Sequence, residues 1–248
     1  MTHPFYISTF CRMDYPLNTA LAALVERTTH VEILADGLHD ILADIRPCTE
    51  YPFSYSVHAP TSDINIASVY ERMRQASLAV LDDTMAACTR IGADHLVIHP
   101  GYAPYEQVRA RSCAALRRSL DNLTRLQEEH GVRACVENMG MWECCHFRGP
   151  KFMMELAVRD LGCTLDVGHA QLNGNLGAFL AVGGFCHVHL HDNHGTNDDH
   201  AACGSGSVDF PSVMQQLPRD ATLVIETKEL DAADRSRSYL TSLMNGEP

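Results

Sequence analysis

The stretch HVHLHDNHGTNDDHAACGSG, residues 187–206, concentrates side chains that bind metal ions. Five histidines and three aspartates occur within this one stretch. Imidazole nitrogens and carboxylate oxygens together suit Zn, Mn, Co or Fe and fit Ca poorly, while Mg stays open for a site dominated by carboxylates. The stretch therefore predicts a divalent-metal centre.

Further donors end short apolar runs elsewhere in the chain. Each one alone is explained as a hydrogen-bonded loop residue or a helix cap. A set of them, each at the end of its own apolar run, is not explained in this way, because burying several carboxylates and imidazoles together without a cation imposes uncompensated desolvation costs. Metal is the best explanation of the set, which comprises His58, His99, Glu137, Asp166, His189 and Glu226.

The runs that carry these donors alternate with segments of helical period. Predicted strands lie at 5–10, 30–34, 53–58, 95–99, 133–138, 163–167, 187–192 and 222–227, and helical patterns at 17–28, 69–92, 108–131 and 210–217. Eight strand–helix units in about 250 residues predict a single-domain α/β protein, the (β/α)8 TIM barrel, whose active sites lie at the C-terminal ends of the strands. A doubly wound open sheet is the alternative, but no glycine-rich turn follows the first strand.

Side-chain alternation along the strands places the donors inside this barrel. It puts His187, His189 and His191 on the inward face, with Val188 and Leu190 toward the helices. In the neighbouring strands the same alternation predicts Cys135, Thr164 and Val224 as inward residues, and Val136, Leu165 and Ile225 as outward residues.

Composition and charge narrow the class of partner. A net charge of −12 without a basic stripe argues against nucleic acid. No apolar run is long enough to cross a bilayer, and MTHPFYISTF at the N-terminus resembles neither a signal peptide nor an anchor, so we expect no membrane partner. Ten cysteines without CxxC pairs are interpreted as reduced thiols, which predicts a cytoplasmic protein. A homo-oligomer stays open.

At the donor residues the sequence resembles the xylose isomerase-like TIM barrel superfamily, which includes endonuclease IV, ketose 3-epimerases and sugar phosphate isomerase/epimerase-like proteins. The specific part is Asp-x-x-His, then His-x-x-Asp, then Asp-x-His-x-x-x-Gly-x-Gly. The resemblance implies one such barrel domain over residues 1–248. The matching pieces are VHAP (57–60), VIHPG (97–101), VENMG (136–140), LDVGHA (165–170), HVHLHDN (187–193), DDHAACGSGSVDF (198–210) and VIETK (224–228).

The resemblance also implies one to three divalent ions, with Zn, Mn, Co, Fe and Mg as candidates. The implied ligands are Glu137, Asp166, His189 and Glu226 for a central metal, His58 and His99 with Glu137 for a second, and His169, Asp198 and His200 for a third, as in endonuclease IV. The sequence assigns no role to His187, His191, His194 and Asp199, takes Asp192 as a loop or supporting residue, and interprets GSG at 204–206 as a tight turn.

Two departures from the superfamily matter. The loop APTSDIN (59–65) lacks the bulky pair that endonuclease IV inserts into DNA, which weakens the expectation of DNA repair. Where the epimerases carry an Arg after the strand-seven His, this chain has His194-Gly195, which weakens the direct transfer of a ketose 3-epimerase substrate.

We rank first a divalent-metal-dependent isomerase or epimerase of a sugar or sugar phosphate. In it Glu137 and Glu226 move the proton through a metal-stabilised enediolate. The side chains expected to contact the substrate or line its pocket are His169, Lys228, Glu32 and Trp142.

The second hypothesis is a phosphoesterase with two or three ions, acting on a small phosphate ester or, with less support, on abasic DNA. The filled set of nine ligand positions favours it. A barrel that binds metal without catalysis ranks third, because no position of the central ligand set is degraded.

Overall fold

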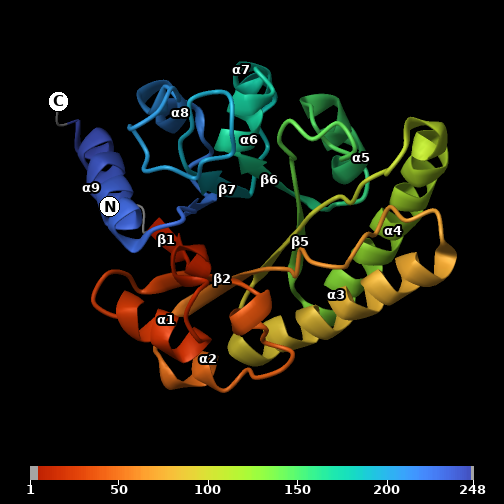
Figure 1. Cartoon of the computed structure of the whole chain (residues 1–248), viewed down its shortest axis with the longest axis horizontal. Helices are drawn as coiled ribbons and strands as arrows, with labels where there is room; N and C mark the ends of the chain where they lie inside the picture. The colour runs from red at the N-terminus through yellow and green to blue at the C-terminus, as the bar shows by residue number, and fades with distance from the viewer. Residues whose placement is uncertain (1–4, 247–248) are drawn as a thin grey trace.

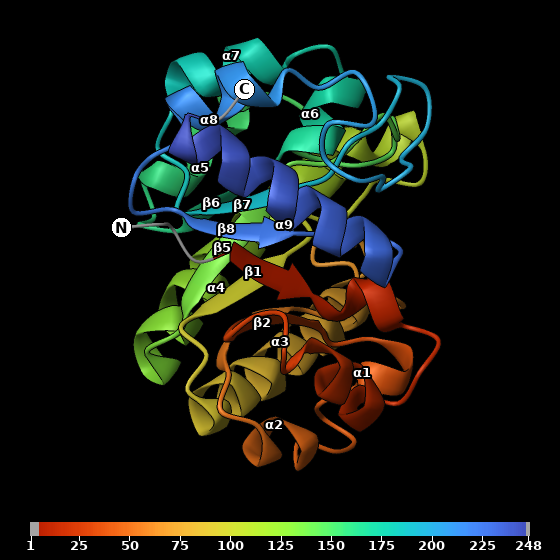
Figure 2. The same cartoon turned by 90° about the vertical axis from the view of Figure 1, so that its left-hand side faces the viewer.

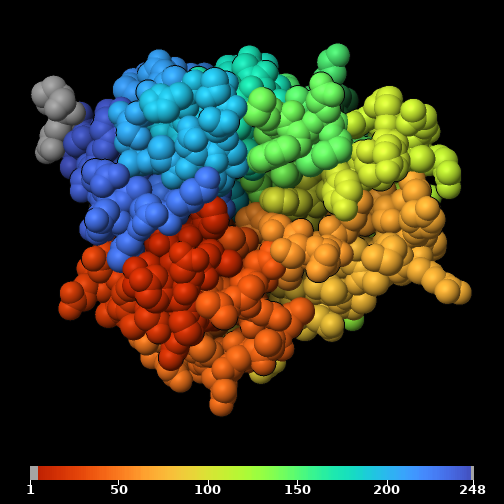
Figure 3. Space-filling view, in the orientation of Figure 1, coloured from red at the N-terminus to blue at the C-terminus, as the bar shows by residue number. Residues whose placement is uncertain are grey.

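The computed structural model describes residues 5–246, and within this range its strands form one closed, parallel barrel in chain order. Strand β8 pairs with β1 through Phe5 and Leu223, which closes the barrel (Figure 1, Figure 2). The N-terminal part of the chain therefore packs directly against the C-terminal part (Figure 3). The predicted TIM barrel is confirmed. Its strands are β1 (Phe5–Ser8), β2 (His30–Leu34), β3 (Ser54–His58), β4 (His95–Ile98), β5 (Arg133–Glu137), β6 (Gly162–Asp166), β7 (His187–Leu190) and β8 (Thr222–Ile225).

The helices surround the barrel, and the two longest, α3 and α4, lie side by side (Figure 1). Each of these two ends at a glycine in the left-handed conformation, Gly92 with φ 71° and Gly131 with φ 67°, as the sequence predicts. No helix within residues 5–246 is both long and apolar enough to span a bilayer. The α-helices are α1 (Leu17–Leu24), α2 (Pro47–Glu50), α3 (Glu71–Ile91), α4 (Arg109–His130), α5 (Met153–Ala157), α6 (Val167–Leu172), α7 (Leu176–Val182), α8 (Phe210–Gln216) and α9 (Leu230–Asn245).

The strands are mostly shorter at their C-terminal ends than predicted. His99 and Glu226 each follow the last residue of their strand by one position, on β4 and β8. The sequence pattern extends the strands because polar residues of the adjoining loop continue the alternation. These two donors nevertheless start the loops at the C-terminal mouth of the barrel, where the fold places functional side chains.

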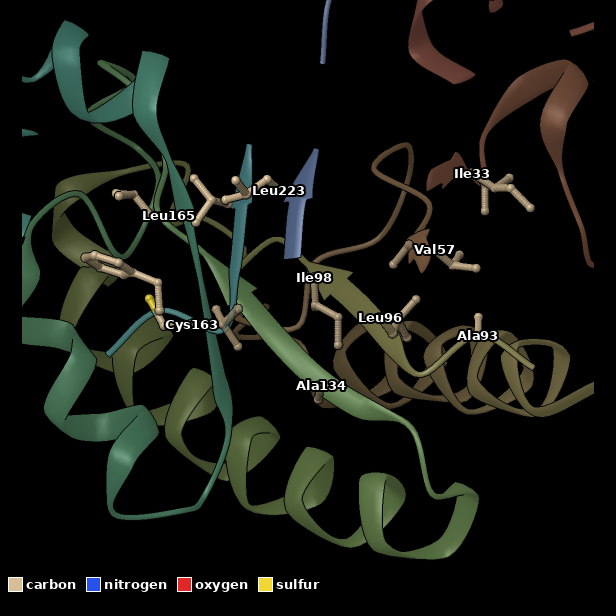
Figure 4. Packing of buried hydrophobic residues seen from close by; sticks show 14 of the residues in the cluster. Ile33, Val57, Ala93, Leu96, Ile98, Ala134, Cys163, Leu165 and Leu223 are labelled. Carbon is tan, nitrogen blue, oxygen red and sulfur yellow. The ribbon is translucent and has the colours of Figure 1, made fainter. Parts of the chain in front are cut away.

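The hydrophobic core lies between the barrel and its helices (Figure 4). Val136, Leu165 and Ile225 belong to this core, so their predicted outward orientation is confirmed, as it is for Val188 and Leu190. The barrel interior is polar instead. Its fully buried side chains include Glu32, Ser56, Thr164, His187 and His189.

The long loop between β7 and α8 is held by the buried carboxylate of Asp192. Its Oδ2 accepts hydrogen bonds from the backbone N–H groups of Gly204 (3.0 Å) and Gly206 (2.8 Å). Its Oδ1 accepts from those of Asn193 (2.9 Å) and Val208 (3.1 Å). The GSG turn thus directs two amides at Asp192, and this arrangement fixes the loop that carries Asp198 and His200.

We expect Asp192→Asn to lower the free energy of unfolding of the metal-free chain by about 1–3 kcal/mol, because an amide nitrogen replaces one acceptor of buried N–H groups. Urea denaturation measures this loss. The control is Asp199→Asn, a partly exposed position in the same loop, which makes the same charge change and should cost little. Equal losses in both variants would contradict the supporting role of Asp192.

Candidate metal centre

Four side chains from the ends of β5 to β8 converge around one nitrogen. His189 Nδ1 lies 3.6 Å from Glu137 Oε1, 3.7 Å from Asp166 Oδ2 and 3.4 Å from Glu226 Oε2. This nitrogen is buried and has no hydrogen-bond partner. Ligand atoms about 2.1 Å from a tetrahedral zinc ion stand about 3.4 Å apart. The spacing and the unpartnered nitrogen therefore fit a divalent cation.

Glu32 supports His189 from below. Its Oε1 lies 2.9 Å from His189 Nε2, although the angles there do not suit a hydrogen bond. Its Oε2 lies 2.7 Å from His187 Nε2 and accepts from Ser56 Oγ at 2.9 Å. Burial alone would raise the pKa of Glu32, but the charges of His189 and His187 hold it well below its ordinary value. Glu32, which the sequence predicts to line the pocket, is wholly buried beneath the donors and lies outside the pocket lining.

Glu137 faces two groups of donors. Its Oε1 points to the central group and lies 3.2 Å from His169 Nδ1. Its Oε2 lies 3.1 Å from His58 Nε2 and 3.3 Å from His99 Nε2. One carboxylate with a different imidazole set at each oxygen has the arrangement of a ligand shared by two ions.

A third group lies on the other side of the centre. Asp198 Oδ2 is 2.9 Å from His200 Nε2 and 3.5 Å from His169 Nε2. The structure thus brings all nine sequence-predicted ligand positions together at the mouth, as one central set and two flanking sets.

Backbone carbonyls fix the tautomers of three flanking histidines. A carbonyl oxygen only accepts, so the Nδ1 facing it carries hydrogen, and Nε2 of the neutral ring presents a lone pair. Each of these Nε2 atoms faces a carboxylate oxygen, and that contact is stable only with a proton or a cation between the two. The Nδ1 donors and their acceptors are His58 to Ala59 O (2.9 Å), His169 to Asn138 O (2.9 Å) and His200 to Glu226 O (3.0 Å).

The pKa values describe the same competition in the metal-free chain. Burial alone would lower the pKa of His169, but the carboxylates of Asp166, Asp198 and Glu137 raise it well above its ordinary value. At His189, burial alone would also lower the pKa, but the surrounding carboxylates outweigh burial and raise the pKa. Burial would raise the pKa of Glu137, yet His189 and His99 hold it well below its ordinary value.

Two histidines without a predicted role support the centre. His191 Nε2 lies 3.0 Å from Asp166 Oδ1 and 3.1 Å from its Oδ2, and His187 contacts Glu32. Inward alternation had placed both rings in the interior, but sequence alone does not identify their partners. His194 is exposed and Asp199 partly exposed.

All of the donors except Asp166 and His189 line a cavity of about 180 Å³. Its other walls are mainly apolar and include Phe10, Met139 and Trp142, whose ring packs edge-on against His169 with centroids 5.5 Å apart. The lining contributed by residues 5–246 contains neither Lys nor Arg. Lys228, which the sequence predicts to contact the substrate, donates from its ammonium to the backbone oxygen of Asp198 at 2.9 Å and lies outside this lining.

Comparison with known proteins places this arrangement in a family. The family model described as "Xylose isomerase-like TIM barrel" matches residues 42–243. A relative from Methanocaldococcus jannaschii, the uncharacterized protein MJ1614, is 34% identical over 233 residues, which cover 92% of this chain and 93% of the relative.

Solved structures share the fold over the whole barrel. A D-tagatose 3-epimerase-like protein superposes with a TM-score of 0.87 at 27% identity, covering 98% of this chain and 97% of that one. The TTHB071 protein of Thermus thermophilus, soaked with ZnCl2, gives 0.74 at 21% identity and full coverage of both chains. An AP endonuclease of family 2 from Brucella melitensis gives 0.79 at 15% identity, covering 96% and 98%.

We expect the metal-free chain to release protons at pH 7 when it takes up Zn²⁺ or Mn²⁺, because the raised pKa values of His169 and His189 keep these rings protonated until a cation displaces the protons. Calorimetric titration in buffers of different protonation enthalpy measures the release. Apparent affinity should rise with pH. Uptake without proton release would contradict the assigned tautomers and charges.

The same shifts set the pH dependence of stability without metal. The histidines with raised pKa values stabilise the fold fully below their unfolded pKa of about 6.5, and this stabilisation is lost as pH rises through the folded values. Glu137, with a lowered pKa, stabilises the fold above its unfolded value of about 4.3, and its contribution is lost on acidification. We therefore expect the urea midpoint of the metal-free chain to fall both when the pH is raised and when it is lowered. Saturating Zn²⁺ should remove the fall at alkaline pH.

Proposed function

We propose that this chain, which belongs to the xylose isomerase-like TIM barrel family, is a divalent-metal-dependent epimerase or isomerase of a small, unphosphorylated sugar. The observation that carries the proposal is the central set of Glu137, Asp166, His189 and Glu226 beneath a pocket whose described lining has neither Lys nor Arg. A divalent ion held there polarises a substrate carbonyl and its neighbouring hydroxyl. The likeness to a D-tagatose 3-epimerase-like protein supports this class of reaction.

The chain supplies two carboxylates for proton transfer. Glu137 ends β5 and Glu226 directly follows β8, so they approach the pocket from different sides of the mouth. In our proposal one of them removes the proton from the carbon beside the carbonyl, and the other returns a proton to the same or the neighbouring carbon. The apolar wall formed by Phe10 and Trp142 excludes water and packs against the C–H face of a sugar.

The side chains of the pocket also favour an uncharged substrate. A phosphorylated sugar needs donors for its phosphate, and Lys228, the cation expected to serve, is engaged with the Asp198 backbone. Hydroxyl groups of a neutral sugar instead find acceptors and donors in the imidazoles and carboxylates of the mouth. We therefore favour a ketose or aldose over its phosphate.

One specific observation favours a second candidate, a multi-metal phosphoesterase. Both oxygens of Glu137 face histidines, and the His58/His99 and His169/Asp198/His200 groups add to it a full second and third ligand set. With several ions in place, phosphate oxygens would bind without lysine or arginine. The acidic chain, with a net charge of −12, then points to a small phosphate ester as the substrate.

Metal content and hydrogen exchange separate the two candidates. Elemental analysis giving about one tightly held divalent ion per chain supports the epimerase, and two or three support phosphoryl chemistry. In deuterated buffer, the epimerase exchanges a C–H hydrogen of a ketose or aldose in the panel, faster for the free sugar than for its phosphate. Release of nitrophenol from diesters without any exchange would overturn the ranking.

We expect Glu226→Gln to lower the rate of C–H exchange at least about 100-fold, because the amide cannot accept the proton. Glu229→Gln, at an exposed position three residues later, is the matched control and should keep the wild-type rate. Both rates are measured by NMR at saturating metal, with bound metal determined for each variant. A Glu226→Gln enzyme that holds metal and exchanges at the wild-type rate would remove Glu226 from the reaction.

A further inference from the structure

A second group of donors lies toward the opposite, N-terminal end of the barrel. His95 begins β4, Cys135 lies inside β5, and Cys186 directly precedes β7. The two Sγ atoms are 3.3 Å apart, and a ligand atom from each of the three residues lies within 4.8 Å of the others. These residues play no part in the mouth or its pocket.

Glycine at one position brings the two sulfurs together. Cys135 and Cys186 belong to β5 and to the start of β7, with β6 between them. Gly162 of β6 pairs with Cys135, and a Cβ at Gly162 would lie 2.6 Å from the sulfur of Cys135 and 2.7 Å from that of Cys186. Any side chain at this position would fill the space in which the sulfurs meet. The missing Cβ is thus a local requirement of this cluster.

A carboxylate orients the imidazole of the cluster. His95 Nδ1 lies 3.1 Å from Asp94 Oδ1, so Nδ1 donates to the carboxylate and Nε2 keeps its lone pair. A carboxylate that holds the far nitrogen of a ligating histidine is a recurrent support of metal sites, since it fixes the tautomer and makes the ligand more basic.

The cluster is separate from the mouth but accessible. Cys135 precedes Glu137 by two residues on the same inward face, which places it about 7 Å lower along the barrel. The ring of His187, whose Nδ1 is buried without a partner, lies between the cluster and the mouth, with its centroid 5.6 Å from that of the His95 ring. Cys135 is buried, whereas Cys186 and His95 are partly exposed, so an ion can enter from the N-terminal face.

We propose that Cys135, Cys186 and His95 form a zinc site, distinct from the catalytic mouth, that joins β4, β5 and β7 at the base of the barrel. Two thiolates and one imidazole supply three ligands of a tetrahedral ion, and water from the open side supplies the fourth. Binding replaces the two thiol protons, which leave to solvent, and no electron is transferred. The inference does not depend on the reaction proposed for the mouth.

Cobalt substitution tests this site directly, because a thiolate ligand gives Co²⁺ an intense near-ultraviolet charge-transfer band that the oxygen and nitrogen donors of the mouth cannot give. The reduced full-length chain, emptied of metal and titrated with Co²⁺, should show this band, and Zn²⁺ should bleach it. Cys186→Ser should abolish the band and lower the zinc content by about one ion per chain, while the weaker visible bands of mouth-bound Co²⁺ persist.

Further variants separate this site from other thiols. Gly162→Ala should lose the band because the new methyl group clashes with both sulfurs and forces them apart. Asp94→Asn should bind Co²⁺ at this site about 10–100-fold more weakly. The control Cys144→Ser/Cys145→Ser removes the adjacent pair in the loop after β5 and should keep the full band.

The outcomes are decisive in both directions. Absence of the band from the wild-type chain, or its survival at full intensity in Cys186→Ser, would overturn the zinc site. A Cys135–Cys186 disulfide in the freshly purified chain, with no zinc bound beyond the amount that the mouth holds, would also overturn it and assign the pair to redox chemistry. Failure of the mouth to catalyse C–H exchange would leave the cobalt result unaffected.

Discussion

The structure depends on neutralising a dense group of carboxylates and imidazoles at one end of a barrel. Glu137, Asp166 and His189 are almost wholly buried, so water cannot screen their charges. In the metal-free chain, protons on the histidines meet this requirement, as the opposite pKa shifts of His169 and Glu137 indicate. A divalent cation meets it with better geometry, because one ion contacts several oxygens and nitrogens at once. Most of the local structure, from the backbone carbonyls that fix the tautomers to the loop held by Asp192, serves to aim lone pairs at the same small volume.

The barrel interior follows from this requirement. TIM barrels usually fill their interior with branched apolar side chains. Here a layer with Cys135 and His95 lies lowest, a pair formed by Glu32 and His187 follows, and the metal donors are uppermost. Hydrophobic stabilisation therefore has to come from the outer layer, where Leu165, Leu223 and their neighbours pack against the helices (Figure 4). The inward face of the strands thus carries the polar donors, and the outward face of the same strands supplies the hydrophobic packing.

Sequence was sufficient where a residue's role depends on its position along a strand. Alternation identifies the outward Val136 and the inward His189, and the order of the runs predicts the closed barrel. It was insufficient where the role depends on a partner distant in the chain. Glu32 meets His187 across 155 positions, so its support of His189 could not be read from β2 alone. Lys228 is expected at the substrate from its type, but its type does not reveal that its ammonium donates to the loop that carries Asp198.

Glu137 links the number of ions to the identity of the base. Its Oε1 belongs to the central set, and its Oε2 faces His58 and His99. With a single central ion, Oε2 would keep only its contacts with His58 and His99, and in our proposal Glu137 and Glu226 would then move the proton as a pair. With a second ion at His58 and His99, both oxygens of Glu137 are ligands, and its basicity is lost to the metals. In our proposal, proton abstraction by this carboxylate pair therefore requires that no second ion sits at His58 and His99. Metal occupancy would thus separate the two chemistries that we propose for the mouth.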